Sequence, residues 1–222
     1  MNILYGYLFS FLYVFGVLFV VSAIKMLCKA EQNDIFRKAV HILIAFTWLP
    51  LYSFLHGTWH FIIIPLAFVI VTAVSAKYSL IKIVERDSEK RKNYGIVHYA
   101  VSMTVLCALA NICPASIISC GIGVFALSFG DGCASLFGQA FRKMNVHITK
   151  TKTLMGSLAC FIFTIFGIFI LSLFIPFSVK FVSLLVIGVV AALMEIVGGN
   201  YDNYSVPFGA TATAMLMGIG EV

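Results

Sequence analysis

Residues 156–175 read GSLACFIFTIFGIFILSLFI, a run of twenty residues without a single charge. A helix needs about 20 apolar residues to cross a bilayer, so this run predicts a transmembrane helix. Similar candidate spans are 3–24, 39–55, 61–76, 96–112, 115–137, 181–197 and 205–220. The runs are continuously apolar rather than alternating, which favours helices over a β-barrel. The sequence therefore predicts an all-α integral membrane protein: a bundle of seven or eight transmembrane helices in a single domain, residues 1–222.

The composition places the chain in a membrane. Of its 222 residues, 61% are apolar and 11% are charged, which excludes a soluble domain and a disordered chain. The formal net charge is +6, but no basic patch is interleaved with aromatic residues, so nucleic acid is not an expected partner. The six cysteines show no Cys-x-x-Cys spacing and lie mostly in apolar runs, which indicates small buried side chains.

The basic residues indicate how the chain is oriented. All but one of the 15 lysine and arginine residues lie in the loops after the first, third and fifth spans, and Lys180 is the exception. Cytoplasmic loops carry an excess of positive charge, so these loops are expected in the cytoplasm and the N-terminus outside. The longer polar loops lie on the same side, so the chemistry is expected to face the cytoplasm.

One acid lies inside an apolar run. Asp131 stands between two glycines in the span 115–137, and a carboxylate at membrane depth is costly enough to indicate a function. A rise of 1.5 Å per residue places it about 24 Å into the helix, just below the cytoplasmic surface. Small residues share its helical face: Ala134, Ser135 and Gly138. They favour the close approach of a ligand, with helix packing as the alternative.

The segment that leads into the next span contains lysines and hydroxyl groups. Residues 150–157 read KTKTLMGS, and free amides at a helix start favour anions. A lysine adds a point charge suited to phosphate. The segment is therefore a candidate phosphate site, and a capped helix with ordinary cytoplasmic lysines is the alternative.

Further acids are expected on the same side. Glu195 lies near the cytoplasmic end of the span 181–197, and Asp202-Asn203 follows in the next loop. Together with Asp131 these acids form a candidate site for a divalent cation, because such ions prefer carboxylate oxygens. The alternative for Glu195 is an ion pair with a loop lysine.

Two other segments carry candidate residues. Arg37-Lys38-x-x-His41 opens the second span, with an interfacial anchor as the alternative role. The third loop contains Glu85-Arg86 and the run 91–95, which are either nucleotide contacts or a solvated charged segment. The chain contains no Gly-x-x-x-x-Gly-Lys-Ser/Thr loop, so it is not a P-loop enzyme.

Four motifs resemble, in kind and in order, those of the CTP-dependent polyprenol kinases. They are Arg37-Lys38-x-x-His41, Asp131-x-x-Ala134-x-x-x-Gly138, Lys152-Thr153-x-x-Gly156 and Asp202-Asn203-x-x-Val206-Pro207. That family includes dolichol, phytol and farnesol kinases and the yeast-type CTP-dependent diacylglycerol kinase. The resemblance covers most of the chain, from about residue 37 to residue 210.

The resemblance implies an enzyme that transfers the terminal phosphate of CTP to a lipid alcohol or diacylglycerol at the cytoplasmic face, with Mg²⁺ bound alongside the nucleotide. The implied catalytic residues are Asp131, Lys152, His41 and Asp202. The implied metal ligands are Asp131, Glu195 and Asp202. The implied nucleotide-binding residues are Arg37, Lys38, Ser135, Gly138, Lys150, Thr153, Gly156, Ser157 and Asn203.

The chain departs from the family pattern at three positions. Arg142 stands where members often have a glycine, Thr151 where they have a lysine, and Met155 where they have a glutamate. The loss of that glutamate changes the implied set of metal ligands, so we expect either that Glu195 or Asp202 compensates or that activity is reduced.

Two other functions compete with the kinase. A CTP:phosphatidate cytidylyltransferase would use similar acids but would release diphosphate, whereas a kinase releases CDP. A transporter would need its acids near the membrane midplane, whereas these are expected near one surface. The identity of the lipid, the choice among CTP, UTP and ATP, and homo-oligomerisation stay open at this point.

Labelling of introduced cysteines tests the orientation. We expect Thr58→Cys to react with a membrane-impermeant maleimide added outside intact cells. Asn93→Cys should react only after permeabilisation, because the third loop carries basic residues. The parent chain without the introduced cysteines is the control. Labelling of Asn93→Cys from outside would show that the orientation is inverted.

Overall fold

The computed structural model describes residues 3–29, 34–78, 94–141 and 146–220, and within these ranges the chain is helical without β-strands. The α-helices are α1 (Ile3–Leu27), α2 (Asp34–Ile44), α3 (Trp48–Leu55), α4 (His60–Tyr78), α5 (Gly95–Ile112), α6 (Ile117–Phe125), α7 (Gly132–Ala140), α8 (Leu154–Phe174), α9 (Phe181–Gly198) and α10 (Asp202–Leu216). Shorter segments of other pitch are η1 (Ala45–Thr47), η3 (Pro114–Ser116), η4 (Ala126–Asp131) and η6 (Gly199–Tyr201). Seven helical runs in the described part are long and apolar enough to cross a membrane, which confirms the predicted all-α membrane fold.

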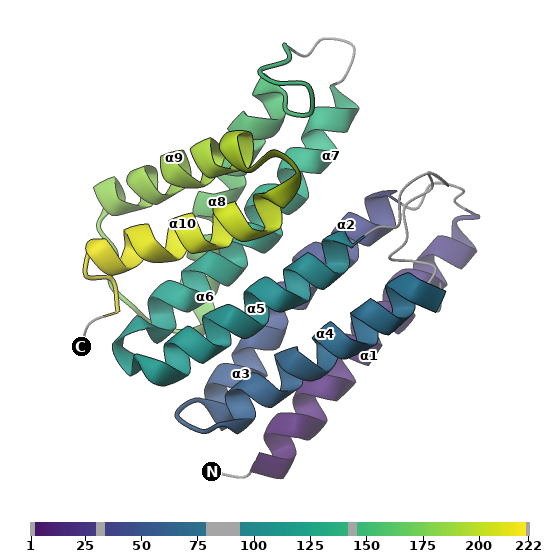
Figure 1. Cartoon of the computed structure of the whole chain (residues 1–222), viewed down its shortest axis with the longest axis vertical. Helices are drawn as coiled ribbons and strands as arrows, with labels where there is room; N and C mark the ends of the chain where they lie inside the picture. The colour runs from purple at the N-terminus through teal and green to yellow at the C-terminus, as the bar shows by residue number, and fades with distance from the viewer. Residues whose placement is uncertain (1–2, 30–33, 79–93, 142–145, 221–222) are drawn as a thin grey trace. The chain divides into compact units, whose positions relative to one another are not determined.

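The helices agree with the predicted spans to within five residues at each end. The last apolar run, Phe181–Leu216, consists of two helices, α9 and α10, with the turn at Gly199 between them. Gly199 has a φ of 55°, a conformation that glycine adopts without strain. Figure 1 shows α9 and α10 side by side and running in opposite directions. The run therefore folds back on itself as a helical hairpin.

The last predicted span, 205–220, is displaced toward the N-terminus in the structure. The helix α10 begins earlier, at Asp202, where an acidic side chain suits the positive end of a helix. It ends at Leu216, because Gly218 and Gly220 adopt φ angles of 64° and 89°. This shift makes Asp202 a helix residue rather than a loop residue.

The chain divides into two compact units, Met1–Asn111 and Ile112–Val222, and each is described by itself. In the first unit, α1 packs against α2 and α3, with a small core of Val17, Val21 and Val40. The hydroxyl of Tyr13 donates a hydrogen bond to the Leu43 carbonyl at 2.8 Å.

The third-loop residues Glu85-Arg86 and 91–93, and Arg142 in the fifth loop, lie outside the described residues.

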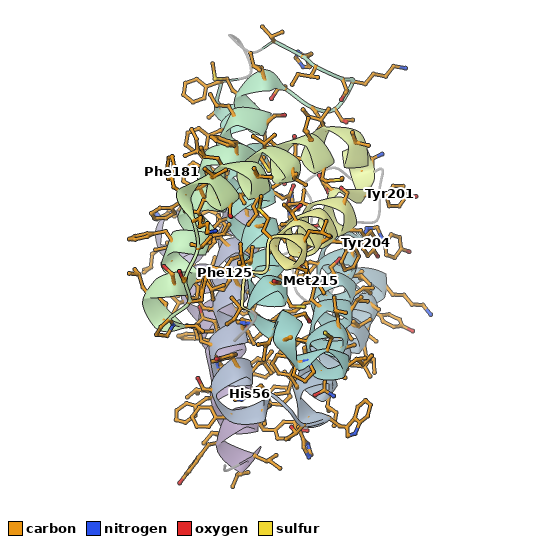
Figure 2. All side chains as sticks on the ribbon, turned by 90° about the vertical axis from the view of Figure 1, so that its left-hand side faces the viewer. His56, Phe125, Phe181, Tyr201, Tyr204 and Met215 are labelled. Carbon is orange, nitrogen blue, oxygen red and sulfur yellow. The ribbon has the colours of Figure 1, made fainter. Side chains whose placement is uncertain are left out.

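The second unit is built around one buried helical run, Pro114–Ala140, which contains α6, η4 and α7. The helices α8, α9 and α10 all pack against parts of it. Figure 2 shows Phe181 at the start of α9 and Tyr201 in η6, just after its end. The loop between α7 and α8 and the turn between α9 and α10 meet at one end of the unit. There Lys152 of the loop contacts Asp202 at the start of α10.

The central run is interrupted by a π-helical segment, η4, which ends at Asp131. A π-segment widens the turn, and such segments are frequent at functional sites. Sequence reasoning treated residues 115–137 as one regular helix and did not find this feature. The wider turn is the local structure that carries Asp131.

Small residues let α7 and α8 approach closely. A Cβ atom added at Gly156 would lie 3.0 Å from the Ala134 carbonyl oxygen and 3.1 Å from the Thr153 hydroxyl. A Cβ atom added at Gly138 would lie 3.1 Å from that same hydroxyl. The small-residue face of α7 is therefore covered by α8, and the packing alternative for this face is confirmed.

Alanine at position 156 tests this close approach. We expect Gly156→Ala to lower the melting temperature in detergent, because the α7 backbone cannot move aside and overpacking costs about 1–3 kcal/mol. The matched control is Gly16→Ala in α1, where nothing lies within 4 Å of an added Cβ atom. That variant should unfold at the wild-type temperature or slightly above it, because alanine favours a helix. Equal melting temperatures for both variants would rule out the α7–α8 contact.

Candidate functional site

Lys152 lies in the loop between α7 and α8, and hydrogen bonds hold its backbone. Its carbonyl accepts hydrogen bonds from the amides of Ile148 and Thr149 at 2.9 and 3.2 Å. Its own amide donates to the Thr149 hydroxyl at 3.1 Å. The Leu154 amide donates to the Val146 carbonyl at 2.8 Å, so the loop turns back on itself before α8 begins. This turn fixes the backbone position from which the Lys152 side chain extends.

The Lys152 ammonium lies between two carboxylates. Its Nζ atom is 2.6 Å from Asp202 Oδ2 and 2.7 Å from Glu195 Oε1. Glu195 lies near the end of α9 and Asp202 starts α10, so the turn at Gly199 brings both acids to one point. The side chains of Lys152 and Glu195 are only 9% and 4% exposed. The structure thus confirms the alternative in which Glu195 pairs with a loop lysine.

The other oxygen of each carboxylate also has a partner. Ser157 Oγ donates to Glu195 Oε2 at 2.9 Å, and the Asn203 amide donates to Asp202 Oδ1 at 2.8 Å. In each acid, therefore, a hydrogen bond fixes the carboxylate oxygen that does not contact Lys152. The sequence assigned Ser157 to nucleotide binding, whereas in the structure its hydroxyl orients Glu195.

Asp131 reaches the same network from the central run. It is 3% exposed, and its charge acts on Lys152. The adjacent Gly130 faces Thr164 Oγ1 and Cys160 Sγ of α8. Together with Ser157, these two side chains form a polar stripe on α8. Sequence reasoning missed this stripe, although the spacing of small polar residues at i, i+3 and i+7 in an apolar run is a signal for it.

The surrounding charges keep Lys152 protonated. Burial by itself lowers the pKa of Lys152, but the negative charges of Asp202, Asp131 and Glu195 outweigh burial. The net result is a pKa raised above the ordinary value of 10.5. The lysine is therefore a cation across the physiological pH range, and it provides a fixed positive charge for an anionic ligand.

The start of α8 is capped, which corrects the expectation of free amides there. The Gly156 amide donates to Thr153 Oγ1 at 3.3 Å, and the Ser157 amide donates to the Thr153 carbonyl at 3.0 Å. The Leu154 amide is bonded to the loop. Thr153 is thus a helix cap. The amides of Leu154, Gly156 and Ser157 are therefore already hydrogen-bonded within the chain.

Other residues assigned from the sequence surround the network. Lys150 is exposed in the turn, and Ser135 accepts a hydrogen bond from Gln139 Nε2 at 3.3 Å within α7. Asn203 takes part through its backbone amide. Met155 is 39% exposed, and two residues along a helix correspond to a rotation of about 200° from Ser157. A glutamate at position 155 would therefore point away from the Ser157–Glu195 contact.

The N-terminal candidates belong to the first unit. Arg37 pairs with Asp34 at 3.2 Å, one turn earlier in α2. The ring of His41 packs edge-on against Tyr99 with ring centroids 4.5 Å apart, and Lys38 is buried. The Arg37–Asp34 pair fits the anchor alternative. A contribution of Arg37, Lys38 and His41 to catalysis stays a prediction.

Asp131, Glu195 and Asp202 were predicted to be the ligands of one metal ion. In the described ranges no group of three or more His, Cys, Asp or Glu residues could hold a metal ion. Glu195 and Asp202 instead share the Lys152 ammonium. Two carboxylates nevertheless suit a Mg²⁺ ion that completes its shell with phosphates and waters. A role of these acids in metal binding therefore stays a prediction.

Comparison with known proteins gives no match, so the function must be inferred from these residues. No protein-family model, curated protein or solved structure matches the chain. The likeness to the polyprenol kinases therefore stays a resemblance of motifs.

Replacement of Lys152 tests the charged network. Lys152→Met keeps a long side chain but leaves Glu195 and Asp202 without their shared cation. Removal of one partner of a buried ion pair costs about 3–5 kcal/mol, so we expect a lower melting temperature. Addition of Glu195→Gln to this variant should restore part of the loss, because one stranded charge is removed. Lys180→Met, at an exposed lysine before α9, is the control and should unfold like the wild type.

The difference in melting temperature between wild type and Lys152→Met has a defined pH dependence. Because the pKa of Lys152 is raised in the folded protein, its contribution to stability is complete below the ordinary value of 10.5 and is lost as the pH rises through the folded value. The melting-temperature difference between wild type and Lys152→Met should therefore stay constant from neutral pH to about pH 10 and shrink above it. A difference that already shrinks near neutral pH would contradict the network.

Proposed function

We propose that the chain is a membrane lipid-alcohol kinase that transfers the terminal phosphate of CTP to a polyprenol-type alcohol (phytol, farnesol or a dolichol-like chain) or to diacylglycerol. The observation that carries the proposal is the buried Lys152 ammonium, which Glu195 and Asp202 share within an apolar helical unit. The resemblance of four motifs to the CTP-dependent polyprenol kinases supports the reaction and the donor.

A purely structural role accounts poorly for such a network. Ionised side chains inside a membrane protein are costly and mark sites of function. Replacement of a buried ion pair by apolar residues is often neutral or stabilising, so stability alone does not require these charges. Asp131, Lys152, Glu195 and Asp202 come from four segments of a chain in which only 11% of residues are charged. Their convergence supports a site for a charged ligand.

The network suits phosphoryl transfer, which needs alignment and charge neutralisation more than covalent catalysis. The Lys152 ammonium would bind a phosphate oxygen, and Glu195 and Asp202 would hold the Mg²⁺ that accompanies CTP. When bound, that ion neutralises charge on the phosphates. Within this unit, Asp131 is the candidate to accept the proton of the lipid hydroxyl.

The first unit, taken by itself, contains an apolar groove. It has a volume of about 770 Å³ and is lined by α1 and by residues from α2 and α3, including Phe9, Tyr13, Gly16 and Phe54. Its walls are almost entirely hydrocarbon and aromatic, which suits an isoprenoid or acyl chain that enters from the bilayer. The basic loops support a site on the cytoplasmic face and an N-terminus outside.

The competing functions differ in their support. A CTP:phosphatidate cytidylyltransferase is the second candidate, because the same lysine and acids suit attack at another phosphate of CTP. A transporter receives less support, since Lys152 belongs to a loop rather than to the midplane of a span.

A product assay tests the proposal. Purified protein in lipid nanodiscs is incubated with Mg²⁺, CTP labelled in the terminal phosphate and a panel of acceptors that contains lipid alcohols, diacylglycerol and phosphatidate. We expect a labelled lipid phosphate and CDP, with less product from ATP or UTP. Release of diphosphate with a cytidylylated lipid would identify the cytidylyltransferase instead, and no turnover with any acceptor would reject both enzymes.

Variants of the site sharpen the assay. Asp131→Asn should reduce turnover by about 100-fold or more without unfolding, because it removes a charge but keeps the shape. Lys152→Ala should raise the KM for CTP most strongly. Lys180→Ala removes an exposed lysine elsewhere and should have wild-type kinetics. Wild-type turnover by Asp131→Asn would exclude that residue from the reaction.

A further inference from the structure

The contacts of Lys152 determine what its two carboxylates can bind. Ser157 holds Glu195 Oε2 and the Asn203 amide holds Asp202 Oδ1. The opposite oxygens, Glu195 Oε1 and Asp202 Oδ2, converge on the Lys152 Nζ atom at 2.7 and 2.6 Å. The two acids thus define one point for a positive charge, and the chain places its own ammonium at that point.

A divalent cation between the same two oxygens would need this position. Mg²⁺ binds carboxylate oxygens at about 2.0–2.1 Å, somewhat closer than an ammonium does. An ammonium and a metal ion cannot occupy one point, and like charges repel strongly where solvent is excluded. Occupation by lysine and occupation by metal are therefore mutually exclusive.

We infer that Lys152 is a built-in occupant of the cation position and that a divalent cation displaces it. This inference rests on the proposed function for the identity of the ligand, a nucleoside triphosphate with its metal. When that ligand arrives, the metal takes the two carboxylates and the released ammonium moves to the phosphates. Glu195, Asp202 and the ammonium each keep a partner of opposite charge in this exchange, so none of these three charges is stranded.

The loop is suited to such an exchange. The backbone of Lys152 is held by hydrogen bonds with Ile148 and Thr149. Glu195 is held by Ser157 on the neighbouring helix. Rotation of the flexible lysine side chain is thus sufficient to move the ammonium, while the acids shift only by the small difference between the ammonium and metal contact lengths. The proposal also gives Ser157 a role as a positioning residue, because it keeps Glu195 oriented when the lysine leaves.

Metal binding in the absence of nucleotide tests the exchange. The free Mn²⁺ concentration is followed by electron paramagnetic resonance during titration of detergent-purified wild type, Lys152→Met and Lys180→Met. We expect Lys152→Met to bind Mn²⁺ at least tenfold more tightly than the wild type, because the competing cation is gone. Lys180→Met should match the wild type. The double variant Lys152→Met/Glu195→Gln should lose the gain.

Two further measurements keep the result decisive. If Lys152→Met is poorly folded, Lys152→Gln retains a hydrogen-bonding side chain without the charge and should show the same gain. An Mn²⁺ affinity in the folded variant equal to or below that of the wild type overturns the exchange, whatever the enzymatic activity. Product analysis of the wild type with CTP is made separately. Tight Mn²⁺ binding by Lys152→Met without any kinase product supports the exchange and rejects the proposed reaction.

Discussion

The arrangement of the second unit depends on one ammonium shared by two carboxylates. Lys152 lies 2.6 and 2.7 Å from Asp202 and Glu195, in surroundings that are almost closed to solvent. An isolated charge would be very costly there, so the three side chains must be positioned together. This requirement links a loop to two helices: the Ile148–Lys152 turn must present the lysine while the turn at Gly199 presents both acids.

Helix packing provides the frame for that network. Gly156 lets α8 lie against the Ala134 carbonyl of α7, and Thr153 caps the first turn of α8. Ser157 then faces Glu195. Residues that first suggest phosphate binding thus include several that build the frame, namely Gly138, Thr153, Gly156 and Ser157. The charged side chains of the network are fewer: Lys152, Glu195, Asp202 and Asp131.

The small number of charged side chains in the network is relevant to the proposed kinase. A metal ion that arrives with a nucleotide needs only one or two protein carboxylates, and Glu195 and Asp202 suffice. A family glutamate at position 155 would point away from them, so Met155 does not weaken the pair. In the proposed exchange, the lysine that neutralises the acids in the structure would also be the cation of the reaction, and a single side chain would serve two states of the site.

The sequence by itself determined the fold class, the positions of the helices and the set of acids and lysines at issue. Uncharged runs such as 156–175 leave the bilayer as the only suitable solvent, and an acid such as Asp131 is conspicuous there. Only the tertiary structure decided that Glu195 pairs with Lys152, that the α8 amides are capped and that η4 has π-helical pitch. The pairing of Lys152 with Glu195 and Asp202 and of Ser157 with Glu195 depends on contacts between segments far apart in the chain, and no local pattern contains that information. The cap is a local contact of Thr153, but only the structure decided between it and the free amides that the segment also suggested.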